Sequence, residues 1–266
     1  MDLLCSLIVL GVAAIAVLGL RKTHGLHPRV VAEGASPLVP GGALHALYRI
    51  VEVVGNASVA LGITANAITA FSFVAAVLAA LLFAAGQLGA GALLALVAAG
   101  SDAFDGYVAR RTGQASDAGE LLDAAVDRYV EFALFTGLAL HLRGSALALA
   151  LVLTAYAGSF MVSYSSAKAD ALRVTPPRGG MRRTERLVLL ILGPAFTVPL
   201  VVFGHGAPWT EAPLFVALTL IAVLSHASAL LRLAYVMRSL RATASRVDGE
   251  GAPGPRDLGV HDRSRG

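Results

Sequence analysis

The sequence contains a single cysteine, and only 14% of its 266 residues are charged. One thiol, Cys5, excludes an internal disulfide framework and any zinc site built from several thiolates. A soluble domain of this length would carry about 25% charged residues. Aromatic residues make up only 6% of the chain. No segment interleaves them with arginines, which argues against a nucleic-acid-binding groove.

Hydrophobic residues are abundant instead, at 56% of the chain with a mean hydropathy of +0.72. This composition predicts an integral membrane protein. Seven apolar runs are long enough to cross ~30 Å of hydrocarbon: 3–20, 65–85, 88–108, 124–142, 145–166, 187–204 and 213–236. The first run has no basic segment before it and no clear cleavage site after it, so we expect a retained helix rather than a signal peptide.

The basic residues fall into alternate loops. They cluster at 21–29, 110–111, 168–186 and 238–246, whereas the loops at 85–88, 142–145 and 204–212 hold only Arg143. Because Lys and Arg concentrate on the cytoplasmic side, this pattern places the N-terminus outside and the C-terminus inside. The net charge of +4 suits anionic lipid headgroups better than nucleic acid.

The remaining segments are more polar. Residues 43–54 show apolar positions at helical spacing, which predicts an amphipathic helix on the cytoplasmic face. The tail is rich in Gly, Pro, Ser and charge, and we expect it to be disordered. The predicted divisions are an N-terminal transmembrane helix at 1–22, a cytoplasmic linker at 23–63, a helical core at 64–239 and the tail at 240–266.

Four aspartates occur in or beside the apolar runs: Asp102, Asp105, Asp123 and Asp127. The first two are three residues apart and the last two are four apart, so each pair lies on one face of a helix. One Asp at the centre of a bilayer costs roughly 2.5–3.5 kcal/mol, so four require compensation, which two divalent cations would supply. Ligands that are all hard oxygens favour Mg²⁺ or Mn²⁺ over zinc.

Small residues and one arginine accompany the aspartates, giving the spacing D-x2-D-G-x2-A-R-x8-G-x3-D-x3-D. Gly106, Ala109 and Gly119 leave room for a bulky ligand, and Arg110 can form a fork to phosphate oxygens. Two metals can clamp the attacking and leaving oxygens of a phosphate diester or pyrophosphate, and a spare carboxylate can accept a proton. Structural polar pairs or an ion-transport path are alternatives, but neither requires the small residues at fixed offsets.

The string from Asp102 to Asp127 resembles, at every defining position, the signature of the CDP-alcohol phosphotransferases. These integral membrane enzymes join a CDP-activated group to an alcohol and release CMP. The resemblance implies an all-α integral membrane protein whose six-helix transmembrane core, 64–239, is catalytic. This chain would add an N-terminal transmembrane helix and a juxtamembrane amphipathic helix. A homodimer in the cell's inner (plasma) membrane, with its active site facing the cytoplasm, is also implied.

Carried over by position, the resemblance implies roles for individual residues. Asp102, Asp105 and Asp123 would bind two Mg²⁺ or Mn²⁺ ions, while Asp127 would bind the second ion or act as general base on the acceptor hydroxyl. The CDP moiety would be contacted by Asn66, Asp105, Gly106, Ala109, Arg110 and Gly119. Asn66 ends the string 62–66, which is similar to a Thr-Pro-Asn string before the family's first core helix, with Ala65 in place of the proline.

Two downstream strings, Ser163–Asp170 and Arg182–Leu187, resemble the phosphatidylinositol phosphate synthase branch of this family. That branch implies CDP-diacylglycerol as donor and an inositol phosphate as acceptor. Three cations would bind the acceptor phosphate: Lys168, Arg183 and Arg186. Arg182 and Thr184 depart from the Glu and Pro of the branch. Glycerol phosphate, serine and inositol remain alternative acceptors, and these three cations are equally compatible with a role in membrane orientation.

Overall fold

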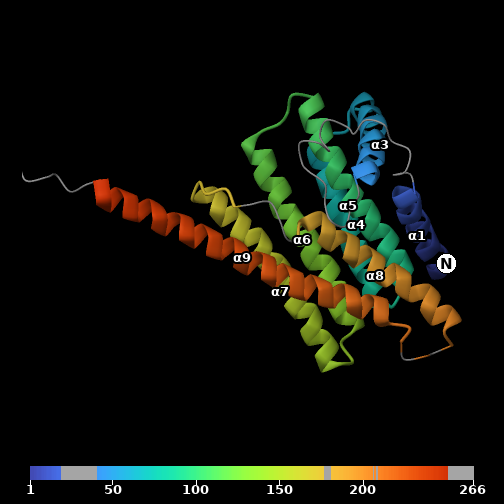
Figure 1. Cartoon of the computed structure of the whole chain (residues 1–266). Helices are drawn as coiled ribbons and strands as arrows, with labels where there is room; N and C mark the ends of the chain where they lie inside the picture. The colour runs from blue at the N-terminus through green and yellow to red at the C-terminus, as the bar shows by residue number, and fades with distance from the viewer. Residues whose placement is uncertain (19–40, 177–180, 206, 208, 251–266) are drawn as a thin grey trace, which may run out of the picture.

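The computed structural model describes residues 1–18, 41–176, 181–205, 207 and 209–250; at 18, 41–49, 102 and 244–250 it describes the backbone alone. Every regular element in these ranges is an α-helix (Figure 1), which confirms the predicted all-α class. The helices are α1 (Asp2–Leu18), α3 (Gly41–Ala60), α4 (Ala65–Ala84), α5 (Leu88–Arg111), α6 (Asp117–His141), α7 (Ala146–Ala171), α8 (Arg183–Phe203) and α9 (Ala212–Glu250).

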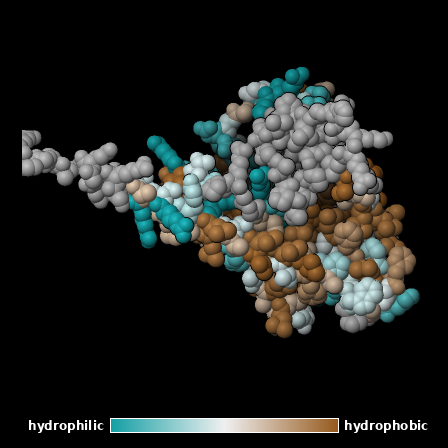
Figure 2. Space-filling view, viewed as in Figure 1, coloured by the Kyte–Doolittle hydropathy of each residue, from teal (hydrophilic) through white to brown (hydrophobic). Residues whose placement is uncertain are grey.

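Five of the described helices are long and apolar enough to cross a membrane, which makes this a multi-pass membrane protein. They are Ala65–Ala84, Leu88–Arg111, Ala146–Ala171, Arg183–Phe203 and Ala212–Thr243. In the face shown in Figure 2, hydrophobic residues gather over the bundle and hydrophilic ones over the projecting end of α9. A continuous hydrophobic exterior is what contact with lipid tails requires.

Two of the seven expected spans are not among these five. α1 is shorter, at 17 residues. α6 has the length, with 25 residues, but its first half is too rich in ionisable side chains. Its described acidic residues are Asp117, Glu120, Asp123, Asp127 and Glu131. The same residues that predict chemistry therefore lower the hydropathy of the helix that carries them.

α4 packs against both α5 and α6, and so holds together the two helices that bear the aspartates. Small residues make this contact close. A Cβ at Gly137 of α6 would lie 2.6 Å from the Cα of Ala80, so the backbones of α4 and α6 touch there. Ala79 of α4 and Ala92 of α5 are fully buried. Such small residues let helices approach closely in a membrane, where packing drives association.

The loop between α5 and α6 returns the chain to the same side of the bundle. Gly113 adopts a positive φ of 69° just after α5 ends, a conformation in which glycine carries no steric cost. Ser116 then caps α6 by accepting a hydrogen bond from the Gly119 N–H at 3.2 Å. The C-terminal end of α5 and the N-terminal end of α6 therefore lie at the same end of the bundle (Figure 1).

The N-terminal helix α1 is packed into the bundle, against α5 and α8. Ser6 is fully buried, and its hydroxyl donates to the carbonyl of Ala195 on α8. That carbonyl has no partner four residues later in its own helix, because Pro199 carries no N–H. At the other end of α1, the Asp2 carboxylate accepts a hydrogen bond from Ala90 N–H in the first turn of α5 at 2.7 Å.

The predicted amphipathic segment lies within α3, which is longer than expected, and residues 23–40 of the predicted linker lie outside the described residues. The structure corrects the start of the tail, which was expected at 240. α9 continues as a helix to Glu250. Between Leu240 and Val247 the chain contains no Gly or Pro, so nothing stops the helix before Gly249. Residues 251–266 lie outside the described residues.

Candidate active site

α5 and α6 carry the predicted metal ligands near the loop that joins them. Asp105 is buried, with 5% of its surface exposed, and its Oδ2 accepts a hydrogen bond from Thr69 Oγ1 of α4 at 2.7 Å. Asp123 and Asp127 are half-buried on α6. Thr69 was not predicted from the sequence, and it fixes the orientation of the Asp105 carboxylate.

The side chain of Asp102 lies outside the described residues. Among the side chains that the structure does describe, no three His, Cys, Asp or Glu form a group that could hold a metal ion. Asp105 is hydrogen-bonded to α4, and Asp127 is paired with Arg183. The predicted donor set consists only of carboxylate oxygens, which fits the chemistry of Mg²⁺ or Mn²⁺. The metal assignment therefore stays a prediction that requires Asp102.

Four of the six residues predicted to contact CDP lie on α5: Asp105, Gly106, Ala109 and Arg110. The guanidinium of Arg110 lies over Gly106, since a Cβ added to Gly106 would come 3.2 Å from Arg110 Nη1. A side chain at position 106 would therefore push slightly against the arginine that was predicted to bind phosphate. Ala109, one residue before Arg110, is half-buried.

The other two predicted CDP contacts come from the neighbouring helices. Asn66 is exposed in the first turn of α4, one turn before Thr69, so the two residues share a helical face toward Asp105. Gly119 lies in the first turn of α6, where its N–H is held by Ser116. The structure thus brings α4, α5 and the start of α6 to one side of the bundle.

A second group of charges joins α6 to α8. Asp127 and Glu131 lie one turn apart on α6, and Arg183 and Arg186 lie one turn apart on α8. Arg183 Nη2 is 2.6 Å from Asp127 Oδ1, and Arg186 Nη2 is 2.8 Å from Glu131 Oε1. The matched spacing produces two parallel ion pairs, of which the second is almost fully buried.

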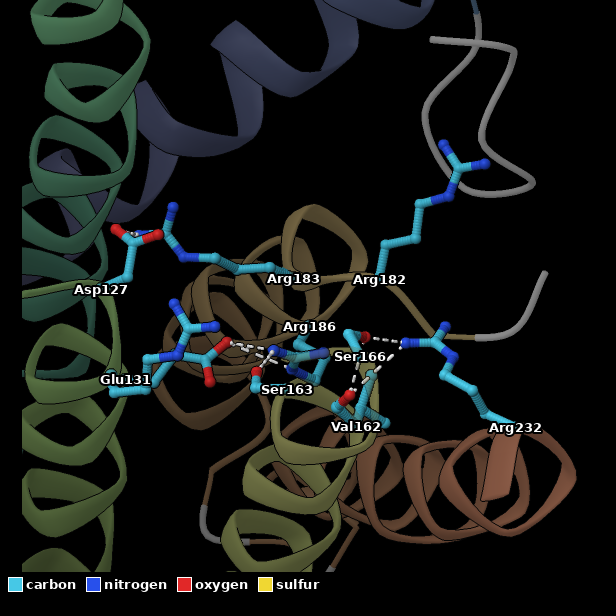
Figure 3. Close-up of a pocket in the computed structure, with 10 residues that line it drawn as sticks. Asp127, Glu131, Val162, Ser163, Ser166, Arg182, Arg183, Arg186 and Arg232 are labelled. Atoms are coloured by element: carbon cyan, nitrogen blue, oxygen red, sulfur yellow. Dashed lines mark hydrogen bonds and ion pairs between the residues drawn. The ribbon is translucent and has the colours of Figure 1, made fainter. Parts of the chain in front are cut away.

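These pairs lie in the wall of a cavity of about 270 Å³ between α6, α7, α8 and α9, which we name the arginine cavity (Figure 3). Its lining is Asp127, Arg128, Glu131, Val162, Ser163, Ser166, Arg182, Arg183, Arg186 and Arg232. Five arginines face two carboxylates, which leaves an excess of three positive charges. The N-terminus of α8 begins here, and its backbone N–H groups add to the positive potential.

The cavity contains one of the predicted metal ligands and two of the three predicted acceptor residues. Asp127 lines it, as do Arg183 and Arg186. Lys168 is exposed near the end of α7 and is not part of the lining. Because Asp127 belongs to both groups, the aspartate motif and the arginine cavity meet at this residue.

Arg232 lines the arginine cavity and was not predicted from the sequence as a site residue. It reaches from α9 toward α7, where its guanidinium donates to Ser166 Oγ and, at 3.4 Å, to the Val162 carbonyl (Figure 3). A signal was present, because Arg232 interrupts the apolar run 213–236, and an arginine within a transmembrane segment usually serves function. Glu131 carried a similar signal, one turn after Asp127 within the apolar run of α6.

The chain belongs to the CDP-alcohol phosphatidyltransferase family, whose model matches residues 62–228. This confirms the resemblance carried by the aspartate motif and makes the protein a transferase. The matched region begins at the α3–α4 junction and ends within α9, so it includes both the aspartates and most of the arginine cavity.

The named relatives include inositol phosphate-lipid synthases of this family. The phosphatidylinositol phosphate synthase of Mycobacteroides abscessus is 31% identical over 204 residues, covering 75% of this chain and 87% of that protein. The archaetidylinositol phosphate synthase of Pyrococcus horikoshii is 35% identical over 147 residues, 54% of this chain and 76% of that protein.

Solved structures of the Mycobacterium tuberculosis phosphatidylinositol phosphate synthase share the fold. One, with CDP-DAG bound, has a TM-score of 0.61 and 30% identity, covering 71% of this chain and 94% of that one. Another, in complex with manganese and citrate, has a TM-score of 0.62 and 29% identity, covering 70% and 88% of the two chains.

Proposed function

We propose that this protein transfers a phosphatidyl group from CDP-diacylglycerol to a hydroxyl of an inositol phosphate and releases CMP. The observation that carries the proposal is the arginine cavity, which places Asp127 of the aspartate motif beside five arginines. The relatives named as phosphatidylinositol phosphate synthases support the same acceptor. The structure solved with CDP-DAG bound supports the donor.

Charge favours a phosphorylated acceptor over a neutral or zwitterionic one. A phosphate monoester carries about −1.5 to −2 at neutral pH and has three acceptor oxygens. The arginine cavity has an excess of three positive charges, and arginine binds phosphate through two parallel N–H donors. Serine and inositol offer no comparable charge. Glycerol phosphate does, so the choice of inositol phosphate rests on the named relatives.

The aspartates would supply the reaction centre. Asp102, Asp105, Asp123 and Asp127 would hold two Mg²⁺ or Mn²⁺ ions, which supply charge neutralisation at the donor pyrophosphate when bound. A relative solved in complex with manganese supports a divalent metal. Gly106 leaves space beside Arg110. These two residues would line the CDP-binding site together with Asn66, Ala109 and Gly119.

Asp127 would act on the acceptor hydroxyl. It lines the arginine cavity, so an inositol phosphate bound there would bring a hydroxyl near its carboxylate. As general base it would take the hydroxyl proton while the oxygen forms a bond to the phosphorus of the phosphatidyl group. The bond from that phosphorus to the CMP oxygen breaks, and CMP leaves with the electron pair.

We also propose that the protein has seven transmembrane spans, which include a retained α1 and α6. It would form a homodimer in the plasma membrane, with the aspartates facing the cytoplasm. The burial of Ser6 against α8 supports an integral α1.

Because Cys5 is the only cysteine, the orientation of the protein in the membrane can be tested in a Cys5→Ser background with single cysteines at positions 144 and 175. An impermeant thiol reagent added outside cells should label position 144 and not 175. The reverse pattern would overturn the orientation, and a monomer in chemical crosslinking would overturn the dimer.

The reaction is tested by measuring CMP release from CDP-diacylglycerol by the purified full chain with each of four acceptors: inositol phosphate, glycerol phosphate, serine and inositol. We expect the highest kcat/KM with inositol phosphate, a requirement for Mg²⁺ or Mn²⁺, and no activity in EDTA. Asp123→Asn should abolish turnover, because a lost charged ligand weakens and misplaces the metal. Asp117→Asn, an exposed aspartate in the first turn of the same helix, is the matched control.

Each failure has a distinct meaning. No CMP release with any acceptor would overturn the enzymatic proposal in favour of a transporting or non-catalytic membrane protein. Preference for glycerol phosphate, serine or inositol would change the acceptor and leave the transferase in place. Full activity in a chelated, metal-free preparation would overturn the two-metal assignment.

A further inference from the structure

Glu131 is a buried carboxylate that neither the aspartate motif nor the proposed reaction uses. Only 4% of its surface is exposed. Its Oε1 accepts hydrogen bonds from Arg186 Nε at 3.1 Å and Nη2 at 2.8 Å, and its Oε2 accepts one from Ser159 Oγ at 2.7 Å. One side chain of α6 therefore contacts both α7 and α8, and Figure 3 shows its contact with Arg186 of α8.

A pair of charges buried this deeply is not explained by stability. Removing two ions from water costs more than their attraction usually returns, and well-packed apolar residues in their place are often neutral or stabilising. Glu131 and Arg186 have side-chain exposures of 5% and 1%. Retaining both charges beside a cavity favours a role in shaping that cavity.

The hydrogen bonds also limit what Arg186 can offer a ligand. A guanidinium has five N–H donors. Glu131 takes two of them, Ser163 Oγ accepts from Nη2 at 3.4 Å, and the Met181 carbonyl accepts from Nη1 at 3.4 Å. The Nε/Nη2 edge of Arg186, one of the two that could bind a phosphate through parallel donors, is therefore held by Glu131. The Nη1/Nη2 edge is engaged by Ser163 and Met181.

Arg183 differs from Arg186 although both line the cavity. Its side chain is 23% exposed, and its partner Asp127 belongs to the reaction centre rather than to the buried wall. Arg232 approaches from α9, and its guanidinium donates to the Ser166 hydroxyl and the Val162 carbonyl on α7. Neither arginine belongs to the Glu131–Arg186 pair, so either can contact a phosphate while that pair stays intact.

We propose that Glu131 is a positioning residue for acceptor binding: it neutralises and immobilises Arg186, so that Arg183 and Arg232 receive the acceptor phosphate. This inference rests on the proposed function, since it assigns the arginine cavity to the phosphorylated acceptor. The proposal assigns different roles to Arg183 and Arg186. Arg183 contacts the acceptor, and Arg186 forms the wall.

The test is steady-state kinetics of Glu131→Gln, which keeps the shape of the side chain and removes its charge. Without a counter-charge Arg186 leaves the wall and competes with Arg183 for Asp127. We expect the KM for inositol phosphate to rise about tenfold, as for one lost charge-assisted hydrogen bond. The KM for CDP-diacylglycerol and the kcat should stay within about threefold. Glu131→Asp keeps the charge and should recover part of the affinity. Glu120→Gln, exposed on the same helix, is the control.

A double-mutant cycle shows whether Glu131 acts through Arg186. In an Arg186→Gln background, Glu131→Gln should add little to the acceptor KM, because its partner is already lost. If a single variant fails to fold, the kinetics of the double variant are compared with those of wild type instead, because the double variant leaves no unpaired buried charge. A raised acceptor KM with an unchanged donor KM supports the proposal. An unchanged acceptor KM, or equal rises in both KM values, overturns it.

Thermal stabilisation by added inositol phosphate provides a readout that does not need turnover. Wild-type protein should be stabilised by this ligand and the Glu131→Gln variant should need about tenfold more. If wild type neither turns over nor is stabilised, the proposed acceptor fails. If wild type passes both tests and Glu131→Gln matches it, the positioning role fails while the proposed function stands.

Discussion

α8 contains buried polar groups at both of its ends, and the two ends differ in how those groups are satisfied. In the first turn, Arg183 and Arg186 meet carboxylates of α6, and an open cavity lies beside them. In the second half, Pro199 removes the helix donor for the Ala195 carbonyl, and one neutral hydroxyl from α1 takes its place.

The difference separates chemistry from architecture. A backbone carbonyl freed by proline needs a single donor, and a serine supplies it without bringing a charge into the membrane. Four charges in two pairs are far more than the fold requires, since charges within membrane segments are expensive and usually functional. The charged end of α8 should therefore respond to substitution in activity, and the neutral end in stability.

The largest effect is expected for Asp127→Asn, at the charged end. Asparagine keeps the shape of the side chain and cannot take a proton, so kcat should fall by roughly 10²–10⁴, with CDP-diacylglycerol still bound. Donor affinity can be followed separately by thermal stabilisation with a CDP-lipid. If the variant binds the donor poorly and retains turnover at saturating donor, Asp127 is mainly a metal or substrate ligand.

A smaller effect is expected for Arg183→Ala. Losing one charge-assisted contact costs about 1.5–3 kcal/mol, or roughly ten- to a hundredfold in acceptor KM. The KM for the donor should be unchanged, because Arg183 lines the arginine cavity, which we propose binds the acceptor. Thr184→Ala, an exposed neighbour in the same turn, is the matched control. Equal kinetics for Arg183→Ala and wild type would return this arginine to a role in membrane orientation.

The sequence was informative where the site is local. The aspartates, Gly106 and Arg110 lie within 102–127, so their spacing predicts which helical faces they share and what they can bind. The all-α class and most apolar spans follow from composition and hydropathy in the same way. These features depend on neighbours along the chain.

The arginine cavity depends on neighbours in space. Glu131 and Arg186 are 55 residues apart, and Ser6 is 189 residues from Ala195. Neither pairing has a periodicity that a sequence could show. Arg186 and Arg183 were predicted to have the same role, because identical residues one turn apart cannot be distinguished until their partners on α6 are known. Arg232 was missed because the apolar residues around it predict only a transmembrane span, and its contacts with α7 exist only in the folded protein.

The smallest effect is expected at the neutral end of α8, where Ser6→Ala removes the donor to the Ala195 carbonyl. An unsatisfied buried carbonyl costs about 1–3 kcal/mol, which should appear as a lower Tm of the purified protein in detergent, with kcat and both KM values unchanged.

Pro199→Ala restores a backbone N–H that can reach the same carbonyl. In that background Ser6→Ala should cost less, and the difference is the coupling between α1 and α8. Thr197→Val is the control, because its buried hydroxyl donates to the Gly193 carbonyl, which the Thr197 N–H already reaches within the helix. If Ser6→Ala lowers the Tm equally with and without Pro199, the serine stabilises α1 by packing alone and the two ends of α8 differ less than their contacts indicate.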